Sequence, residues 1–449
     1  MILKLWQSIL VACALVVAGM SGAWAQSAVG LERAGAGYMK RLCASAPVQG
    51  AARCHVEVAT DSKGRALALT LRPQSSVTLG AVPYYARDLW SAYYGTTTMP
   101  APPPGARPTV AAVAAYGYPK AAADLAQYRQ MNGLPPLCSA TVTTGCVKFT
   151  KLNQSGVAGS YPAGNSSWAQ EQALDVQMIS ALCPWCNIVL VEAGSASYAN
   201  LGKAEVTAGN QPGVVAITNS FGGSETGSSL YAGSFSPSNT VINSYAGKLN
   251  PAIAVVASSG DSAYAGGAEF PSSSPYVLSV GGTTLTYAAG VWSQTAWSKA
   301  GSGCSKVYSQ MAWQSPALPS TACVGRVATD VSAVADINTG VVSVYRGVLY
   351  RYGGTSVGAP IIAGIIGQRN QPIGLTVNSG TVATSVYPAP GGGNVETGYG
   401  KNLYAQRGAL RDVTSGKTGT CTIGFLCNAA AGYDGPTGLG TPNGSLSPF

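Results

Sequence analysis

The fold of this chain is decided by the stretch Tyr352-Gly-Gly-Thr-Ser-Val-Gly-Ala-Pro-Ile-Ile-Ala-Gly-Ile-Ile366. The strand-like segment Val341 to Tyr352 precedes the glycines, and an Ala/Ile-rich helical pattern follows the hydroxyl pair. Ser356 is therefore expected where a strand gives way to a helix N-terminus, whose unpaired N–H groups create a local positive potential. Gly353 and Gly354 permit a tight turn and leave room for a substrate chain. By itself the stretch is consistent with a nucleophile or with an ordinary turn capped by a hydroxyl side chain.

Residues 1–25 have the order of a secretory signal peptide. Lys4 precedes an apolar run from Ile9 to Val17, and Ala23-Trp-Ala25 forms the small-residue end, so a cut is expected after Ala25. The segment is too short to stay as a membrane anchor, and no later apolar run reaches the ~18 residues that span a bilayer. We expect an exported monomer, secreted or periplasmic, with no stable membrane anchor.

The spacing of the cysteines also supports export. Cys13 falls in the signal segment, and the other ten of the 11 cysteines form neighbouring couples along the chain, a pattern typical of short-loop disulfides made in an oxidising compartment. Cys183-Pro-Trp-Cys186 has the spacing of a redox motif, but it lies between a helical pattern and a buried-strand run, so we expect a structural role. The couples are Cys43 and Cys54, Cys138 and Cys146, Cys183 and Cys186, Cys304 and Cys323, and Cys421 and Cys427.

Composition narrows the class of protein. Only 10% of the residues are charged, and the formal net charge of +9 is not gathered into runs, which argues against a nucleic-acid partner. Gly, Ser, Thr and Ala are abundant, as in a compact secreted enzyme with many tight turns.

Residues 26–81 form a small N-terminal section. The alternating pattern His55-Val-Glu-Val58, the turn at Asp61 to Gly64 and a second alternating run from Arg65 to Leu71 predict a β-hairpin unit. The Pro- and Gly-rich segment Thr96 to Pro108 is predicted to be a loop or linker.

Residues 82–449 are predicted to form one large α/β domain. Buried apolar runs alternate with helical segments, which favours a parallel sheet with helices on both faces and functional groups at the carboxyl ends of the strands. The predicted helices are Tyr84 to Tyr94, Ala121 to Met131 and Trp168 to Leu182, and the predicted strands are Val110 to Tyr116, Ile188 to Glu192, Val214 to Asn219 and Ala252 to Ser258.

A nucleophilic Ser356 needs a base, and histidine is the usual one. The chain contains one histidine, His55, in the small N-terminal section, where a packed or exposed bystander is the more ordinary interpretation. This distribution argues against a Ser-His-Asp triad and against a His/Cys metal site.

A carboxylate is the other candidate for the base. Glu171 and Asp175 are four residues apart in a helical pattern, so both project from one face with no basic residue in the segment to neutralise them. Close like charges raise one of the two pKa values when they are desolvated. The alternative is a solvated acidic face.

Asp261 is a third candidate. It follows the buried run Ala252 to Ser258 in Ser259-Gly-Asp261, which places its carboxyl at the carboxyl end of the sheet, on the side expected for Ser356. A protonated Asp at this position would donate a hydrogen bond to a tetrahedral oxyanion. The alternative is a turn residue that bonds its own backbone.

Taken together, these motifs resemble the sedolisins, serine-carboxyl peptidases with a subtilisin-like fold and a glutamate base. The family's Ser-Gly-Thr-Ser motif with a Pro four residues on is matched by Gly353-Gly-Thr-Ser356 and Pro360, with Gly in place of the first Ser. The likeness runs from about Tyr84 to the C-terminus. Its other motifs are Glu171 with Asp175, Ser259-Gly-Asp261, Phe270 to Leu285 and Thr329 to Asp336.

The resemblance implies a peptidase that acts on polypeptides. Ser356 would attack the scissile carbonyl, Glu171 would take its proton, Asp175 would orient Glu171, and Asp261 would supply the oxyanion hydrogen bond. Because Glu stays ionised well below the pH of about 6.5 at which His protonates, we expect activity that falls from about pH 4 towards neutrality.

The resemblance also implies two binding sites. Ser220, Phe221 and Gly222, in Asn219-Ser-Phe-Gly222, would line the cleft and pair with the substrate backbone. One structural Ca²⁺ is expected near the C-terminus, where capping of turns by two Asp residues is the alternative. Its ligands would be the side chains of Asp412 and Asp434 and the carbonyls of Val413, Ala430 and Gly432, with Ala430 where the family commonly has Gly.

Alternatives remain at this point. Sedolisins usually carry a propeptide as large as an independent domain, so residues 26–81 are either a short prosegment or an addition to the mature enzyme. A catalytically silent secreted binding protein on the same scaffold is the second hypothesis. An esterase-type hydrolase is disfavoured because the Gly-x-Ser-x-Gly elbow and a downstream His are missing.

Overall fold

The computed structural model describes residues 31–43, 49–231, 253–370, 398–444 and 449. The predicted signal segment 1–25 lies outside the described residues. No helix within the described ranges is long and apolar enough to cross a membrane.

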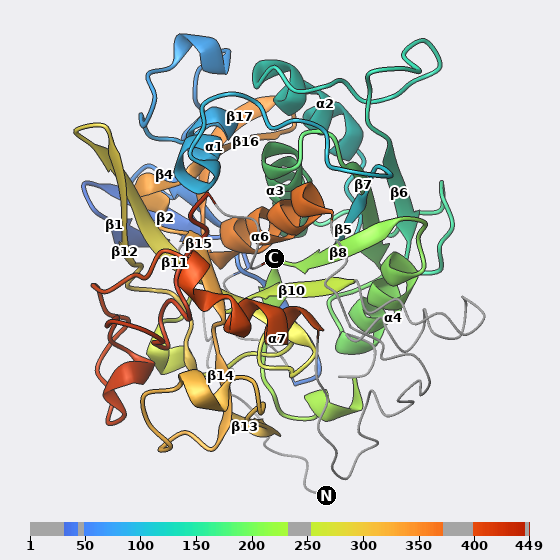
Figure 1. The fold of residues 1–449 in the computed structure, drawn as a ribbon. Helices are drawn as coiled ribbons and strands as arrows, with labels where there is room; N and C mark the ends of the chain where they lie inside the picture. The colour runs from blue at the N-terminus through green and yellow to red at the C-terminus, as the bar shows by residue number, and fades with distance from the viewer. Residues whose placement is uncertain (1–30, 44–48, 232–252, 371–397, 445–448) are drawn as a thin grey trace, which may run out of the picture.

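An eight-stranded sheet forms the centre of the molecule (Figure 1). Its strand order is β12-β11-β10-β8-β5-β7-β6, with β15 paired to β11, and every pair except β11 with β12 is parallel. The predicted parallel sheet is confirmed. The strands are β5 (Thr109–Ala115), β6 (Phe149–Asn153), β7 (Asn187–Ala193), β8 (Val214–Asn219), β10 (Ala254–Ser258), β11 (Val277–Ala288), β12 (Val291–Ala296) and β15 (Val331–Val334).

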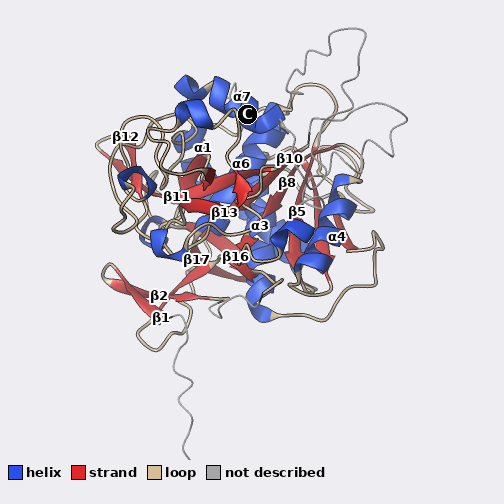
Figure 2. Cartoon of the chain, turned by 90° about the horizontal axis from the view of Figure 1, so that it is seen from below, coloured by secondary structure: helices blue, strands red, loops and turns tan. Residues whose placement is uncertain are grey.

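Helices cover both faces of this sheet (Figure 2). α3 (Ser166–Leu182) and α6 (Thr355–Arg369) pack against each other and against the sheet, while α4 (Tyr198–Gly209) packs on β5, β7 and β8 from the other side. α1 (Ala86–Tyr94) and α2 (Ala121–Met131) cover α3, and α7 (Gly398–Ala405) contacts β11. Short 3-10 helices lie at Gln74–Ser76, Ser228–Leu230, Tyr264–Gly266, Ser315–Ala317, Ile337–Thr339, Arg407–Ala409 and Gly424–Leu426.

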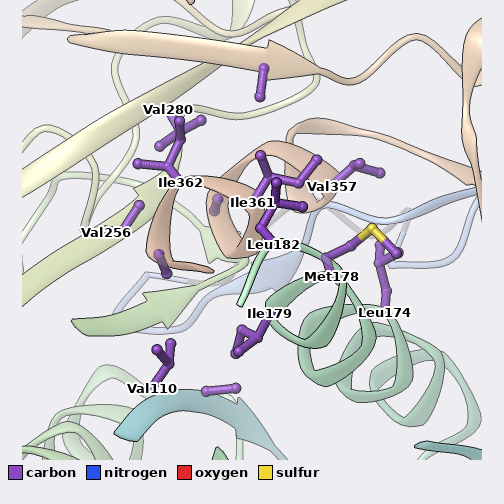
Figure 3. Packing of buried hydrophobic residues seen from close by; sticks show 14 of the residues in the cluster. Val110, Leu174, Met178, Ile179, Leu182, Val256, Val280, Val357, Ile361 and Ile362 are labelled. Atoms are coloured by element: carbon purple, nitrogen blue, oxygen red, sulfur yellow. The ribbon is translucent and has the colours of Figure 1, made fainter. Parts of the chain in front are cut away.

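The contact between α3 and α6 fixes the position of the helix that carries Ser356. Met178 and Leu182 of α3 face Val357 and Ile361 of α6 in a fully buried layer (Figure 3). A Cβ on Gly364 would lie 2.9 Å from Leu182 Cβ, so glycine allows the two helices to approach closely. Each buried side chain of this size contributes about 1.5–3 kcal/mol, which stabilises the α3–α6 contact.

A second, five-stranded sheet joins the N-terminal section to the strand before Ser356. Its order is β1-β2-β4-β17-β16, and all its pairs are antiparallel. The strands are β1 (Leu31–Ala34), β2 (Gly37–Arg41), β4 (Glu57–Thr60), β16 (Val341–Tyr345) and β17 (Val348–Gly353). Two small antiparallel sheets pair β13 (Gly303–Ser309) with β14 (Gly325–Ala328), and β3 (Arg53–Cys54) with β9 (Phe221–Gly222).

Two strand predictions were wrong in detail. The segment Val341 to Tyr352 is a hairpin and not one strand, because Arg346 and Gly347 at its centre take φ values of 51° and 77° and reverse the chain. The run Arg65 to Leu71 forms only isolated bridges, one of them from Leu69 to Leu349. The expected N-terminal hairpin is therefore reduced to its turn end, where Thr60 of β4 bridges antiparallel to Ala66 and Leu67 N donates to Ala59 O over 2.9 Å. The rest of the pairing of β4 is with β2 and β17.

The disulfide pairing was predicted correctly. All five couples of neighbouring cysteines are bonded, including Cys183 with Cys186 at the end of α3. That last pair is fully buried, which agrees with a structural role.

Candidate active site

Ser356 lies at the junction of β17 and α6, as the glycine pair predicted. Gly354 precedes the helix with a φ of 97°, a left-handed conformation that favours glycine. The Ser356 side chain is fully buried, and its Oγ donates to Glu171 Oε2 over 2.8 Å. Pro360 lacks the N–H that would bond the Ser356 carbonyl in a regular helix, and Ser220 Oγ lies 3.4 Å from that carbonyl.

Glu171 and Asp175 project from α3, whose N-terminus is capped by the Asn165 side chain. Both carboxyls are fully buried, and Ser220 Oγ donates to Asp175 Oδ1 over 2.5 Å. Burial raises the pKa of Glu171 well above its usual range, and the adjacent Asp175 raises it further. Burial likewise raises the pKa of Asp175. The solvated acidic face considered as an alternative is therefore excluded.

Asp261 follows β10 and contacts the start of α6. Its Oδ1 accepts hydrogen bonds from Thr355 N over 2.8 Å and from Thr355 Oγ1 over 2.7 Å, whereas its Oδ2 is buried without a protein partner. A Cβ on Gly354 would lie 2.7 Å from Asp261 Oδ2, so glycine is needed there. Burial raises the pKa of Asp261, and the neighbouring His55 partly offsets this effect.

The segment predicted to bind substrate lies beside these groups. Ser220 follows β8, and Phe221 and Gly222 form β9. Ser356 Oγ lies 3.3 Å from the Ser220 carbonyl oxygen, so this segment borders the nucleophile directly. β9 is paired with β3 of the N-terminal section, with Arg53 opposite Gly222.

His55, treated above as a bystander, is buried in the site. Its backbone N–H lies 3.0 Å from Glu171 Oε2. Its ring nitrogens contact other residues, Nδ1 lying 2.7 Å from Ser258 Oγ and Nε2 3.0 Å from Glu269 Oε2. The ring is thus engaged away from Ser356, whose hydroxyl partner is a carboxylate.

Glu269 was missed by the sequence reasoning. Arg53 Nη2 donates to its Oε1 over 2.7 Å. Burial opposes ionisation of this carboxyl, but His55 and Arg53 together outweigh burial and hold its pKa below the usual value. Glu269 lies in an irregular loop, so no helical or strand periodicity points to it. The only sequence signal was its position directly before Phe270-Pro271.

The residues predicted for calcium come together in a C-terminal loop pair. Asp412 Oδ2 accepts from Gly432 N over 2.8 Å, and Asp434 Oδ2 accepts from Ala430 N over 3.1 Å. Burial raises the pKa of Asp434 to about 7, and the charge of Asp412 adds to this. Among the described residues, no group of three or more His, Cys, Asp and Glu side chains is arranged to hold a metal. The donors here are two carboxylates and nearby carbonyls, a set of hard oxygen ligands.

The chain was compared with known proteins. No family model matches it. It is 30% identical to kumamolisin from Bacillus sp. (strain MN-32) in an alignment of 208 residues that covers 42% of this chain and 34% of kumamolisin. It is 32% identical to sedolisin from Pseudomonas sp. (strain 101) over 184 residues, which are 38% of this chain and 28% of sedolisin. The chain thus matches about a third or less of the length of these curated relatives.

A solved structure supports the same relationship at the level of the fold. Pseudomonas sedolisin, described as a serine-carboxyl proteinase and complexed with two molecules of pseudo-iodotyrostatin, superimposes with a TM-score of 0.60. That match has 24% identity and covers 82% of this chain and 96% of the sedolisin chain. Together with the curated matches, this subtilisin-like architecture supports membership of the sedolisin family.

Proposed function

We propose that this protein is an exported, acid-active serine endopeptidase that uses Ser356, Glu171, Asp175 and Asp261. The observation that carries the proposal is the 2.8 Å hydrogen bond from Ser356 Oγ to Glu171 Oε2 inside a buried acidic cluster. A silent binding protein on this scaffold has no need to keep a hydroxyl on a buried carboxylate, so the enzyme is the better explanation.

The first half of the reaction follows from these contacts. Glu171 accepts the proton of Ser356 as Oγ attacks the scissile carbonyl. Glu171 Oε1 and Asp175 Oδ2 are both buried without a protein partner, and a proton shared by the two carboxyls would satisfy both atoms. Asp175, held by Ser220, thus fixes the orientation of Glu171.

Asp261 is proposed to stabilise the oxyanion. Thr355 donates two hydrogen bonds to Asp261 Oδ1, so the proton of the neutral carboxyl is placed on Oδ2, which has no protein partner and faces the cleft. A neutral carboxyl donates a hydrogen bond to the developing negative charge, and removal of one such donor typically costs about 10²–10³-fold in rate. Glu171 then protonates the leaving amine and activates the water that hydrolyses the acyl-enzyme.

An acidic optimum follows from this division of roles. Asp261 must hold its proton, and burial raises its pKa in the direction that helps. Burial also raises the pKa of Glu171, which must be ionised to act as the base, so Glu171 limits activity on the acid side. As the pH rises, Asp261 loses this proton, so the oxyanion loses its donor and meets a negative charge instead. We expect activity to fall from about pH 4 towards neutrality.

Polypeptide substrates are proposed to bind in extended form. The edge at Ser220 to Gly222 already accepts an antiparallel strand, β3, with backbone hydrogen bonds. A substrate would take the place of β3 at this edge, and its side chains would enter pockets on either side.

One Ca²⁺ is proposed to join the two C-terminal loops. Asp412 and Asp434 would bind it through side chains, and Val413, Ala430 and Gly432 would bind it through carbonyls. The two carboxylates lie close enough for the charge of Asp412 to raise the Asp434 pKa, which a divalent cation would relieve. Calcium at this position is structural and takes no part in the peptide-bond chemistry.

The proposal is tested by digestion of a denatured protein at about pH 4. Wild type is expected to cleave it and Ser356→Ala is not, while Ser75→Ala, which changes an exposed serine, should match the wild type. Equal cleavage by wild type and Ser356→Ala would remove the peptidase assignment.

A further inference from the structure

Asp261 lies in the loop after β10, and this loop is held by the segment that joins β12 to β13. Gly301 N donates to the Gly260 carbonyl over 2.7 Å, and Ala263 N donates to the Lys299 carbonyl over 2.9 Å. These two backbone hydrogen bonds fall on either side of Asp261 in the loop. The position of the Asp261 backbone therefore depends on a segment that takes no direct part in the proposed reaction.

The loop after β10 and this second segment approach each other closely. A Cβ on Gly301 would be 2.3 Å from the Ser259 carbonyl oxygen, so glycine is needed at this position. Trp297 and Ala300, which precede Gly301, are buried in a cluster with Ala335. The segment between β12 and β13 is thus itself packed and gives the loop after β10 a fixed support.

Support from outside the loop matters because Gly260 directly precedes Asp261. Its φ is 111°, a conformation that favours glycine, and glycine restrains the backbone least of all residues. Its N–H donates to Thr355 Oγ1 over 3.2 Å, and its carbonyl accepts from Gly301 N. Both backbone polar groups of Gly260 are therefore held, one by α6 and the other by the segment between β12 and β13.

Thr329 in turn holds Gly301. It lies between β14 and β15, is fully buried, and donates from Oγ1 to the Gly301 carbonyl over 3.2 Å. Its φ of 119° is rare for a β-branched residue, and such a conformation persists only where the surroundings fix it. Tyr433 contributes to this by donating from its hydroxyl to the Thr329 carbonyl over 2.8 Å. The unusual backbone thus directs a threonine hydroxyl at Gly301.

We propose that Thr329 is a positioning residue for Asp261. Through Gly301 it fixes the backbone of Gly260, and thereby the place at which Asp261 Oδ2 meets the oxyanion. This inference rests on the proposed function, in which Asp261 is the oxyanion donor. Thr329 is not itself a catalytic residue, because its hydroxyl bonds Gly301 and not the reacting atoms.

A positioning role of this kind affects kcat and not KM. The oxyanion donor acts mainly in the transition state, so an interaction that positions it leaves ground-state binding of the substrate unchanged. Loss of the donor itself costs about 10²–10³-fold in rate, whereas a donor that stays but moves should cost less, about tenfold.

The test is to measure kcat and KM on a quenched fluorescent peptide at about pH 4. Thr329→Val keeps the branched shape but removes the hydroxyl, and it should lower kcat about tenfold with KM within about twofold of wild type. Thr329→Ser restores the hydroxyl and should recover most of kcat. Gly301→Ala keeps the Thr329 hydroxyl but pushes against Ser259, so it should lower kcat as well.

Thr283→Val is the matched control. Thr283 of β11 is also fully buried, and its Oγ1 donates to Gln294 Oε1 over 2.6 Å, so the same substitution removes a comparable hydrogen bond. Urea midpoints should fall for both variants, whereas kcat should fall only for Thr329→Val. A loss of kcat that is equal in the two variants would assign the effect to stability and overturn the inference.

The Asp261→Ala background shows whether the effect passes through Asp261. Thr329→Val should have little further effect on kcat there, because the donor that it positions is gone. The same comparison with Gly301→Ala does not depend on the folding of Thr329→Val.

The outcomes separate this inference from the proposed function. A loss of kcat on Thr329→Val that persists in full in the Asp261→Ala protein would overturn the inference, as would an unchanged kcat of Thr329→Val, and either result leaves the peptidase proposal standing. An Asp261→Ala protein with the kcat of wild type would refute the oxyanion role and this inference together.

Discussion

Replacement of Glu205 by glutamine is expected to stabilise this protein at neutral pH and not in acid. Glu205 lies on α4, fully buried against the sheet, and burial raises its pKa from 4.5 to about 8, with a small opposing effect from Asn219. Between these two values the unfolded chain has lost the proton and the native chain keeps it. The native state then binds more protons than the unfolded state, so the free energy of unfolding falls as the pH rises.

The size of the effect follows from the shift. Neutral pH lies about 2.5 pH units above 4.5, the pKa of Glu205 in the unfolded chain. At ~1.36 kcal/mol per unit, the free energy of unfolding of the wild type falls by about 3 kcal/mol over this range. Glutamine has nearly the same shape and does not ionise. Its amide can also donate to Asn219 Oδ1, which has no protein partner.

The assay is urea unfolding followed by tryptophan fluorescence, with Ser356→Ala in both proteins to prevent self-digestion. At about pH 4 the two midpoints should agree, and at about pH 7 the Glu205→Gln protein should be more stable by about 3 kcal/mol. Other buried carboxyls such as Glu57, whose pKa burial raises to about 8, are common to both proteins and cancel. A stability difference that is the same at both pH values would refute the reasoning.

Three further predictions concern the site and the calcium loops. Asp261→Asn should fold normally, keep a hydrogen-bond donor at the oxyanion and extend activity to higher pH, because an amide donates without a titratable proton; an unchanged pH profile would argue against the oxyanion role. Ser220→Ala removes the hydrogen-bond donor to Asp175 Oδ1. With a peptide substrate it should lower kcat and leave KM nearly unchanged. Removal of calcium with a chelator should lower Tm, and more so at about pH 7 than at about pH 4, because protonation of Asp434, whose pKa lies at about 7, weakens the site in acid; no change in Tm at either pH would exclude the ion.

Much of the candidate site could be predicted because its groups stand at the end of a strand, at the start of a helix or on one face of a helix. Ser356 begins a helix, Glu171 and Asp175 share a helical face, and Asp261 follows a buried strand. Such positions are fixed by periodicity, since a parallel sheet brings the carboxyl ends of its strands to one edge. The central sheet, its helices and the disulfide couples followed from the same local patterns.

What could not be predicted depends on contacts between distant segments. His55 was interpreted as a bystander because its neighbours in sequence do not reveal Ser258 or Glu269, which lie more than 200 residues away. The run Arg65 to Leu71 alternates like a strand, yet only Ala66 bridges β4, which otherwise pairs with β2 and β17, so tertiary pairing overrode most of the local pattern. The Arg346-Gly347 turn was missed because an Arg with positive φ is unusual.

The pairing of β4 with β17 also sets the order in which the molecule is assembled. Val58 of β4 lies opposite Tyr352 of β17. β4 is synthesised well before β17, so the two strands can pair only after most of the chain has been made. Contacts of such sequence separation form late in folding, because the intervening chain must first lose its conformational freedom. Ser356 and Glu171 are themselves 185 residues apart, so an unfinished or unfolded chain has no assembled nucleophile with which to damage itself or its neighbours.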